Sequence, residues 1–157
     1  MPGVGKSTVG VLLAKAMGRD FLDTDVLIQA REGRALQDII DTEGLKALCQ
    51  IEQRYVLSLK AGGCVIATGG SVVYSPQAMA HLASGGVIVH LELELDLLEG
   101  RLRNLATRGV VMERGQSLAD LYGQRMPLYR KYAQITVDCA AKAHEQVAEE
   151  IIRKIRC

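Results

Sequence analysis

The first eight residues, Met1–Thr8, constrain the fold of this chain more than any other stretch. They read M-P-G-V-G-K-S-T and match the end of the pattern G-x-x-x-x-G-K-[ST], a phosphate-binding loop that leads into a helix. Gly3 and Gly5 leave room for a phosphate against the backbone, because glycine carries no side chain. Lys6 can reach the outer phosphates and the Ser7 hydroxyl can bind Mg²⁺. The stretch therefore predicts a nucleotide-binding protein.

The start of the pattern is missing from this chain. Its first glycine, and the strand that normally delivers the loop, would stand immediately before Met1. We therefore expect Met1 to be an internal residue of the motif, either because the start has been assigned too late or because the chain is a fragment.

Apolar periodicity predicts helices alternating with short strands along the whole chain. Helices are expected at residues 7–17, at 26–41 with a break at Gly33, at 43–59, from Ser75 onward, at 95–106, at 117–132 and at 144–156. Strands are expected from Phe21 to the D-T-D segment and at residues 64–68, 87–91 and 135–138, the second of them fully buried. The alternation indicates one domain over residues 1–157, a three-layer α/β/α fold with a parallel sheet.

Composition excludes several classes of protein. A net charge of +1 gives no general attraction to nucleic acid, and there is no Trp for stacking on bases. No run approaches the ~18 apolar residues of a membrane span. The four cysteines have no metal-ligand spacing, so we expect reduced thiols and a cytoplasmic protein. No membrane or nucleic-acid partner is expected, and a monomer is the default.

Two segments at the predicted carboxyl ends of strands carry candidate acceptor-site residues. In D-T-D, Asp23 and Asp25 would point to opposite sides of an extended segment, one toward Mg²⁺ and the other toward a substrate hydroxyl as a base. The alternative is a pair of N-cap residues for the next helix. Gly69 and Gly70 would let the backbone approach a ligand, or would simply form a tight turn.

Two arginines complete the candidate site. Arg108 lies in a polar loop, residues 107–117, that we expect to be a mobile lid closing over the phosphates. Arg125, before a Pro-Leu-Tyr segment, can present its guanidinium to a carboxylate. The alternative for each is a solvated surface charge.

The order of these motifs (phosphate loop, D-T-D, T-G-G, arginine-containing lid, R-x-P-L-Y) resembles the shikimate kinase family over nearly the whole chain. The resemblance implies a P-loop kinase fold with a five-stranded parallel sheet. It also implies transfer of the γ-phosphate of ATP to a hydroxyl of shikimate, with Mg²⁺ as cofactor.

Site roles follow from the resemblance, motif by motif. Nucleotide-binding residues would be Gly3, Val4, Gly5, Lys6, Ser7, Thr8, Arg101 and Arg108, with Arg101 placed toward adenine. Metal binding would fall to Ser7 and Asp23, and catalysis to Lys6, Asp25 and Arg108. Substrate-binding residues would be Asp25, Gly69, Gly70 and Arg125, the last pairing with the substrate carboxylate.

The chain departs from the family pattern at several positions. Cys49 occupies the place of a second carboxylate-binding arginine, for which Lys46 or Arg54 would have to substitute, and Ser71 replaces the third glycine of a triplet. The lid reads R-G-V-V where the family has Arg-Pro. The missing first strand is central in this fold, so we expect an incomplete sheet and reduced stability.

These observations predict an ATP- and Mg²⁺-dependent kinase that phosphorylates shikimate. A first alternative is a kinase of the same fold for another small hydroxylated acid, suggested by Cys49 and Ser71. A second is a kinase-like binding protein without activity, suggested by the incomplete loop and the lost arginine. An intact set of residues argues against the second, because binding alone does not require all of them together: Lys6, Ser7, Asp23, Asp25 and Arg108.

Overall fold

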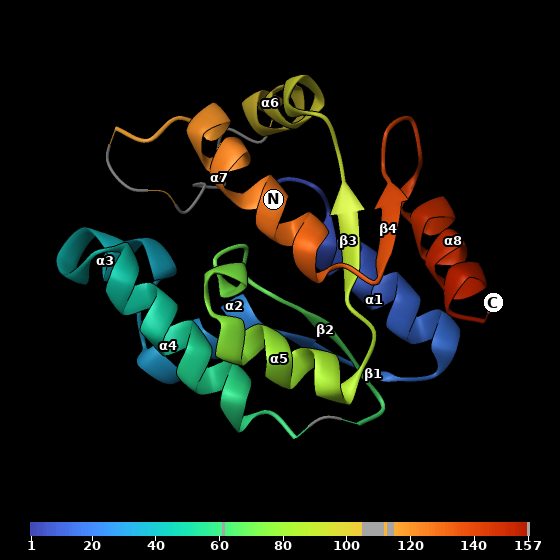
Figure 1. The fold of residues 1–157 in the computed structure, drawn as a ribbon, viewed down its shortest axis with the longest axis horizontal. Helices are drawn as coiled ribbons and strands as arrows, with labels where there is room; N and C mark the ends of the chain where they lie inside the picture. Colours follow the sequence, from blue (N-terminus) through green and yellow to red (C-terminus); the bar gives the residue numbers. More distant parts are fainter. Residues whose placement is uncertain (61, 105–111, 113–114, 157) are drawn as a thin grey trace.

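The computed structural model describes residues 1–60, 62–104, 112 and 115–156. The helices of this part, besides the 3₁₀ turn η1 (Val72–Tyr74), are α1 (Lys6–Met17), α2 (Thr24–Glu32), α3 (Leu36–Glu43), α4 (Leu45–Ser58), α5 (Pro76–Gly85), α6 (Leu95–Asn104), α7 (Leu118–Tyr132) and α8 (His144–Arg156). The strands are β1 (Asp20–Asp23), β2 (Cys64–Ala67), β3 (Val89–Glu92) and β4 (Ile135–Asp138). Strands and helices alternate as predicted (Figure 1).

The strands form two separate parallel pairs. β1 pairs with β2 in the register Asp20 to Cys64, and β3 pairs with β4 in the register Val89 to Ile135. Among the described residues no hydrogen-bonded ladder joins β2 to β3. A cavity of about 430 Å³ separates them, lined by apolar residues of both strands. The expected parallel α/β arrangement is confirmed, and the sheet is incomplete at its centre.

The prediction that the strand at residues 64–68 is fully buried is wrong. Cys64, Val65 and Ile66 are half-buried, and only Ala67 is buried. The physical reason is that β2 has one neighbouring strand, while its other edge faces the cavity.

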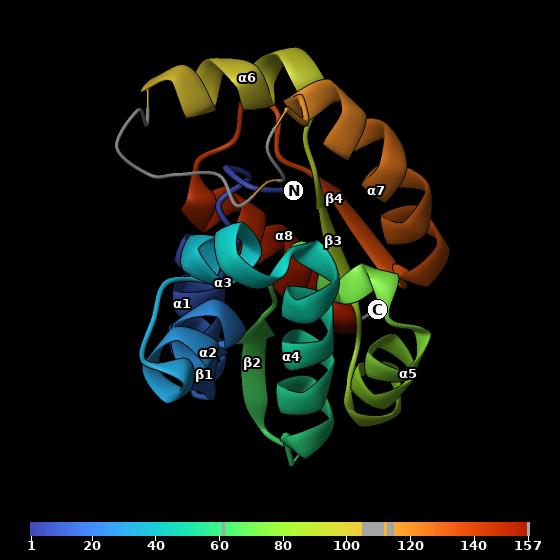
Figure 2. The same ribbon diagram turned by 90° about the vertical axis from the view of Figure 1, so that its left-hand side faces the viewer.

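Helices cover both faces of the strands. In Figure 2, α1 lies on one side of the strands and α5 and α7 lie on the other. α1 packs against α8 and the first strand pair. The largest apolar cluster, which includes Val9, Leu98, Leu121, Val137 and Ile151, is built from α1, α6, α7, β4 and α8. The three-layer arrangement is thus the predicted one.

Element boundaries follow local sequence signals. Gly18 and Gly33 end α1 and α2 in the left-handed conformation, with φ of 61° and 67°, which glycine adopts without strain. The break expected at Gly33 separates α2 from α3. Ser75 caps α5 with Pro76 at its first position, also as expected. In contrast, β3 begins at Val89 rather than at residue 87.

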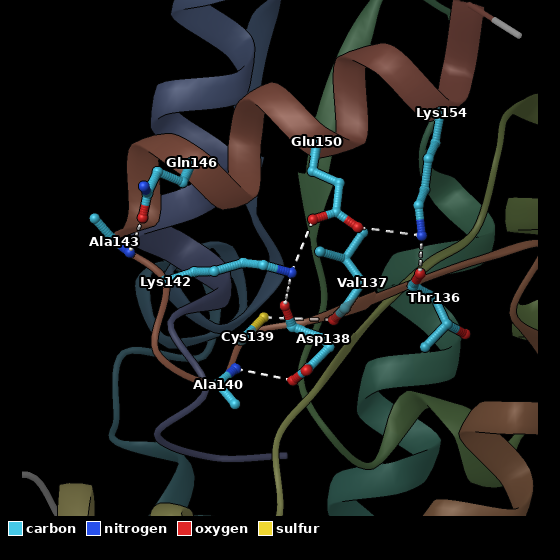
Figure 3. A network of polar contacts seen from close by, with 10 residues as sticks. All are labelled: Thr136, Val137, Asp138, Cys139, Ala140, Lys142, Ala143, Gln146, Glu150 and Lys154. Atoms are coloured by element: carbon cyan, nitrogen blue, oxygen red, sulfur yellow. Dashed lines mark hydrogen bonds and ion pairs between the residues drawn. The ribbon is translucent and has the colours of Figure 1, made fainter.

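A polar network fixes the segment between β4 and α8 (Figure 3). Lys142 Nζ donates to the carbonyl of Asp138 at 2.8 Å and pairs with Glu150 at 2.9 Å. Lys154 Nζ donates to the Thr136 carbonyl at 2.7 Å and contacts the same carboxylate at 3.2 Å. Glu150 therefore joins α8 to the end of β4, which sets the position of the residues that follow this strand.

Two expectations from composition can be examined in the fold. Cys64 and Cys139 are free thiols. None of the helices in the described residues is long and apolar enough to cross a bilayer.

Replacing Ser75 with Ala should lower the free energy of unfolding by about 1–2 kcal/mol. The Ser75 hydroxyl accepts from the Ala78 amide at 3.1 Å and donates to Gln53 Oε1 on α4 at 2.7 Å, and both bonds would be lost. Urea denaturation measures the change. Ser84→Ala is the matched control on the same helix, because the exposed Ser84 hydroxyl donates to the carbonyl of His81 within the same helix. Equal losses in both variants would contradict the capping role.

Candidate active site

A cavity of about 570 Å³ lies where the phosphate loop meets the carboxyl ends of β1 and β2. It is lined by the phosphate loop, the start of α2, the loop after β2, and side chains from α4, α6, α7 and α8. The sequence-predicted residues that line it are Gly3, Gly5, Lys6, Ser7, Thr8, Asp23, Asp25, Gly69, Gly70, Arg101 and Arg125. The structure thus brings these predicted residues together from five distant segments of the chain.

One predicted residue among those described, Val4, does not line this cavity. The Val4 side chain is 1% exposed and belongs to the apolar core, so only its backbone remains for a phosphate. Arg108, predicted as the lid arginine, lies outside the described residues, as does most of the expected lid at residues 107–117.

The phosphate loop takes a conformation that requires glycine. Gly3 and Gly5 have φ of 75° and 98°. A Cβ on Gly5 would stand 2.7 Å from Nε2 of His144, and one on Gly3 would stand 3.0 Å from the Leu102 side chain. Gly5 is also the N-cap of α1 and gives its first turn no side-chain cap. The free amides of that turn, with the helix dipole, form an anion site at the edge of the cavity.

Lys6 is held at the centre of this loop. It is half-buried, and its Nζ donates to the carbonyl of Met1 at 2.8 Å. Burial lowers the pKa of Lys6, whereas the nearby carboxylate of Asp25 opposes that shift. A bound phosphate would replace the Met1 carbonyl as the hydrogen-bond acceptor of the Lys6 ammonium group, because a charge-assisted bond to an anion is stronger than one to a carbonyl.

Asp23 has two tasks at once. Its Oδ1 accepts from the amides of Asp25 and Val26 at 2.9 and 3.3 Å and so caps α2. Its Oδ2 accepts from the Ser7 hydroxyl at 2.5 Å. Asp23 therefore caps α2 and also lies beside Ser7, the predicted metal-binding residue.

The extended conformation predicted for D-T-D is wrong. β1 ends at Asp23, and Asp25 lies in the first turn of α2. The N-cap bonds of Asp23 start the helix one residue after the strand, so helical geometry rather than strand alternation separates the two carboxylates. Asp25 still lines the cavity, and its Oδ1 has no hydrogen-bond partner among the described residues. Burial raises the pKa of Asp25, against the opposing effect of Lys6.

Glycine is required at positions 69 and 70 because side chains from other elements lie against the backbone there, not because the chain turns. The Gly69 amide donates to Thr24 Oγ1 at 3.0 Å, and a Cβ there would lie 2.6 Å from Asp25 Oδ1. A Cβ on Gly70 would lie 2.6 Å from Nη1 of Arg125. Any side chain at either position would displace the groups that line the cavity.

Arg125 is a buried cation beside the two-glycine segment. It is 4% exposed, and its Nε donates to the Tyr74 hydroxyl at 3.3 Å. Across the part of the chain that the structure describes, no carboxylate forms an ion pair with Arg125. A buried charge is costly without a partner, so this position favours an anionic ligand.

Arg101 connects the phosphate loop to the segment after β4. Its guanidinium donates to the carbonyl of Val4 at 3.4 Å and to that of Cys139 at 3.3 Å. The arginine thus lies on the phosphate-loop side of the cavity, away from Arg125. Its predicted contact with adenine stays a prediction.

The expected substitutes for the missing arginine do not line the cavity. Arg54 pairs at the surface with Glu32 at 2.7 Å, and Lys46 is exposed. Cys49 is half-buried on α4. Arg125 is therefore the only arginine among the described residues at the acceptor end of the cavity.

Sequence reasoning missed several residues of the site. Thr24 orients the Gly69 amide, while His144 and Leu102 close over the phosphate loop. Nothing local in the sequence singles out these three. Glu52 did leave a signal, because it occupies the position one turn after Leu48 in an otherwise buried stripe of α4. It is 1% exposed, and burial raises its pKa to about 7.

The donor set fits Mg²⁺ bound together with a nucleotide. Mg²⁺ takes oxygen ligands and usually keeps several waters and phosphate oxygens, so one or two protein oxygens suffice. Ser7 and Asp23 supply such oxygens beside the loop. Within the described residues there is no cluster of three or more His, Cys, Asp or Glu that would hold a metal alone.

Comparison with known proteins agrees with this geometry. The sequence profile described as SKI: Shikimate kinase matches residues 2–156. The chain is 39% identical to shikimate kinase of Thiobacillus denitrificans over 145 residues, which covers 90% of this chain and 79% of that protein. It is 33% identical to shikimate kinase of Dehalococcoides mccartyi, covering 98% of this chain and 89% of that protein.

A solved structure gives the same result in three dimensions. Shikimate kinase from Acinetobacter baumannii in complex with shikimate superposes with a TM-score of 0.86 at 31% identity, covering 98% of this chain and 88% of that one. The P-loop kinase fold predicted from the sequence is thereby confirmed. With a phosphate loop, an acceptor pocket beside it and a family profile over nearly its whole length, the chain belongs to the shikimate kinase family.

Proposed function

We propose that this chain transfers the γ-phosphoryl group of ATP to a hydroxyl of shikimate. The observation that carries the proposal is a single cavity with two different ends. One end holds Lys6 and the first turn of α1, which has no side-chain cap. The other holds Asp25 and the buried Arg125, which forms no ion pair with a described residue. This arrangement suits a polyphosphate facing a hydroxylated carboxylic acid.

At the donor end, backbone amides of residues 3–8 would hold the phosphates, and Lys6 would neutralise charge on the transferred group. Ser7 and Asp23 would hold Mg²⁺, which when bound supplies further positive charge at the phosphate oxygens. Arg101 would close the nucleotide side from the segment after β4.

At the acceptor end, Asp25 would orient the reacting hydroxyl and accept its proton. Its Oδ1 accepts no hydrogen bond from a described residue, which leaves an acceptor for that bond. Arg125 would bind the substrate carboxylate, and Gly69 and Gly70 would let the sugar-like ring approach the backbone. Positioning of the two reactants would supply most of the rate enhancement.

The wider assignments belong to the same proposal. We infer one domain over residues 1–157, in which Arg108 belongs to a lid that closes on the bound nucleotide. We also infer a cytoplasmic monomer whose partners are small molecules rather than nucleic acid or membranes. The net charge of +1 supports the exclusion of nucleic acid.

A second candidate is a kinase of the same fold for another small hydroxylated acid. Two residues favour it, since Cys49 stands where the family carries a carboxylate-binding arginine and Ser71 adds a hydroxyl to the cavity wall.

A coupled assay of ADP release with ATP, Mg²⁺ and shikimate decides between these candidates. Saturable turnover supports shikimate as the acceptor. If the folded protein binds ATP but shows no turnover, the proposal fails, and a panel of other hydroxy acids then tests the second candidate. Loss of activity toward the whole panel would favour a binding protein.

Lys6→Met should lower kcat for ADP release by about 10²–10³-fold, because it removes the cation nearest the transferred phosphoryl group. Lys15→Met is the matched control, since Lys15 is exposed on the same helix and outside the cavity. It should retain the kcat of the unmodified chain. A drop below twofold for Lys6→Met would refute the assigned role.

Arg125→Lys should raise KM for shikimate about tenfold, because lysine cannot make the two parallel bonds of a guanidinium to a carboxylate. KM for ATP should change little. Arg130→Lys serves as control on α7, where Arg130 pairs at the surface with Glu92 at 2.9 Å. An unchanged KM for shikimate in Arg125→Lys would show that another group holds the carboxylate.

Cys49→Arg should lower KM for shikimate about tenfold, because it restores a charge-assisted bond of ~1.5–3 kcal/mol at the acceptor end. Steady-state kinetics at fixed ATP measures the change. Gln50→Arg, at the next and exposed position of α4, is the control for added charge. A KM that rises or stays constant in Cys49→Arg contradicts the expectation.

A further inference from the structure

Glu52 is a buried acid at the acceptor end of the cavity, and the mechanism above gives it no task. It extends from α4 into the cavity wall and is 1% exposed. Its Oε2 has no hydrogen-bond partner among the described residues. A Cβ on Gly69 would collide with its Oε1, so the carboxyl group lies directly over the two-glycine segment.

Arg125 lies over the next residue of the same segment. A Cβ on Gly70 would stand 2.6 Å from its Nη1. Glu52 and Arg125 thus approach consecutive glycines from α4 and α7, yet no ion pair forms between them in the described structure. A ligand in this part of the cavity would meet both side chains.

The groups facing Glu52 come from four elements. From the loop after β2, Ser71 forms a side-chain hydrogen bond with the carboxyl group, and from α2 Asp25 adds a like charge. From α7, the positive charge of Arg125 favours the ionised form of Glu52, and the Tyr129 phenol also interacts electrostatically with Glu52. On α4 itself, Cys49 occupies the position three residues earlier, where side chains are neighbours on a helix.

This environment favours the neutral acid. Burial is the largest influence and raises the pKa of Glu52 to about 7, and the negative charge of Asp25 adds to it. Ser71 and Arg125 favour the charged form but do not outweigh burial. A second carboxylate brought in by a ligand would strengthen the preference, because two carboxylates at one site share a proton.

We propose that Glu52 binds the carboxylate of the acceptor beside Arg125 as a neutral carboxylic acid, donating a hydrogen bond where the family otherwise places a second arginine. The inference rests on the proposed function in one respect, that the acceptor is a carboxylic acid such as shikimate. Ser71 forms a hydrogen bond with the same carboxyl group, and Cys49 lies one helical turn before it on α4. Both positions at which this chain departs from the family pattern are thus neighbours of Glu52. Glu52 then contributes to the choice of acceptor.

The proposal has a pH signature with a definite sign. The neutral form of Glu52 binds the acceptor and predominates below its pKa, so affinity is greatest at low pH. As pH rises through about 7 the group ionises and KM for shikimate increases. Between pH 6 and pH 8 the increase should be about tenfold, because each unit above the pKa reduces the neutral fraction tenfold.

The test is KM for shikimate from pH 6 to pH 8 in three proteins. Glu52→Gln keeps the shape and a donor but cannot ionise, so its KM should stay near the low-pH value of the unmodified chain. Ser71→Ala removes a bond to the charged form, so its midpoint should move to higher pH. The control Glu149→Gln, an exposed carboxyl on α8, should keep the full slope.

Calorimetry gives a readout that does not depend on turnover. Shikimate binding at pH 8 in buffers of different ionisation enthalpy should show uptake of about one proton by the unmodified chain and none by Glu52→Gln. A flat profile, a KM that falls as pH rises, or the same slope in Glu52→Gln overturns the proposal. If shikimate neither binds nor turns over, the proposed function fails instead, which separates the two outcomes.

Discussion

The hydrogen bonds of Asp23 are the interaction on which the rest of the site depends. One oxygen of this carboxylate starts α2 and the other reaches the Ser7 hydroxyl at the beginning of α1. The next residue, Thr24, accepts from the Gly69 amide and so ties the end of β2 to the same point. Asp25 follows at the edge of the cavity. Three consecutive residues thus connect the nucleotide end, the acceptor end and the loop between them.

Charge balance in the cavity explains why its ligands are anions. Lys6 and Arg125 face Asp25 and Glu52 across a partly buried space, and the pKa shifts of Lys6, Asp25 and Glu52 all follow from burial first. Each ionised group therefore gains stability from an opposite charge that the protein does not fully supply. A bound phosphate chain would supply negative charge beside Lys6, and a bound carboxylate would supply it beside Arg125. Binding of the substrates would therefore remove water from the site and supply these opposite charges at the same time.

The sequence was sufficient for the order of elements and for most of the residues around the cavity. Glycines and capping residues have local causes, so Gly18, Gly33 and Ser75 could be placed without a structure. The start of α2 could not, because it depends on whether Asp23 caps a helix or continues a strand. Thr24 and His144 could not be found either, since their partners lie far along the chain. Tertiary contacts of this kind leave no periodic trace in a sequence.

The space between β2 and β3 has a consequence for how the two strand pairs are held together. In the described residues each strand has a neighbour on one edge alone, and the two facing edges border a cavity of about 430 Å³. Helix packing therefore links the two pairs in this part of the chain: α1 packs against β1, β2 and α8, and α8 packs against β4. Movement of one pair relative to the other would require repacking of the contact between α1 and α8 rather than breaking of backbone hydrogen bonds.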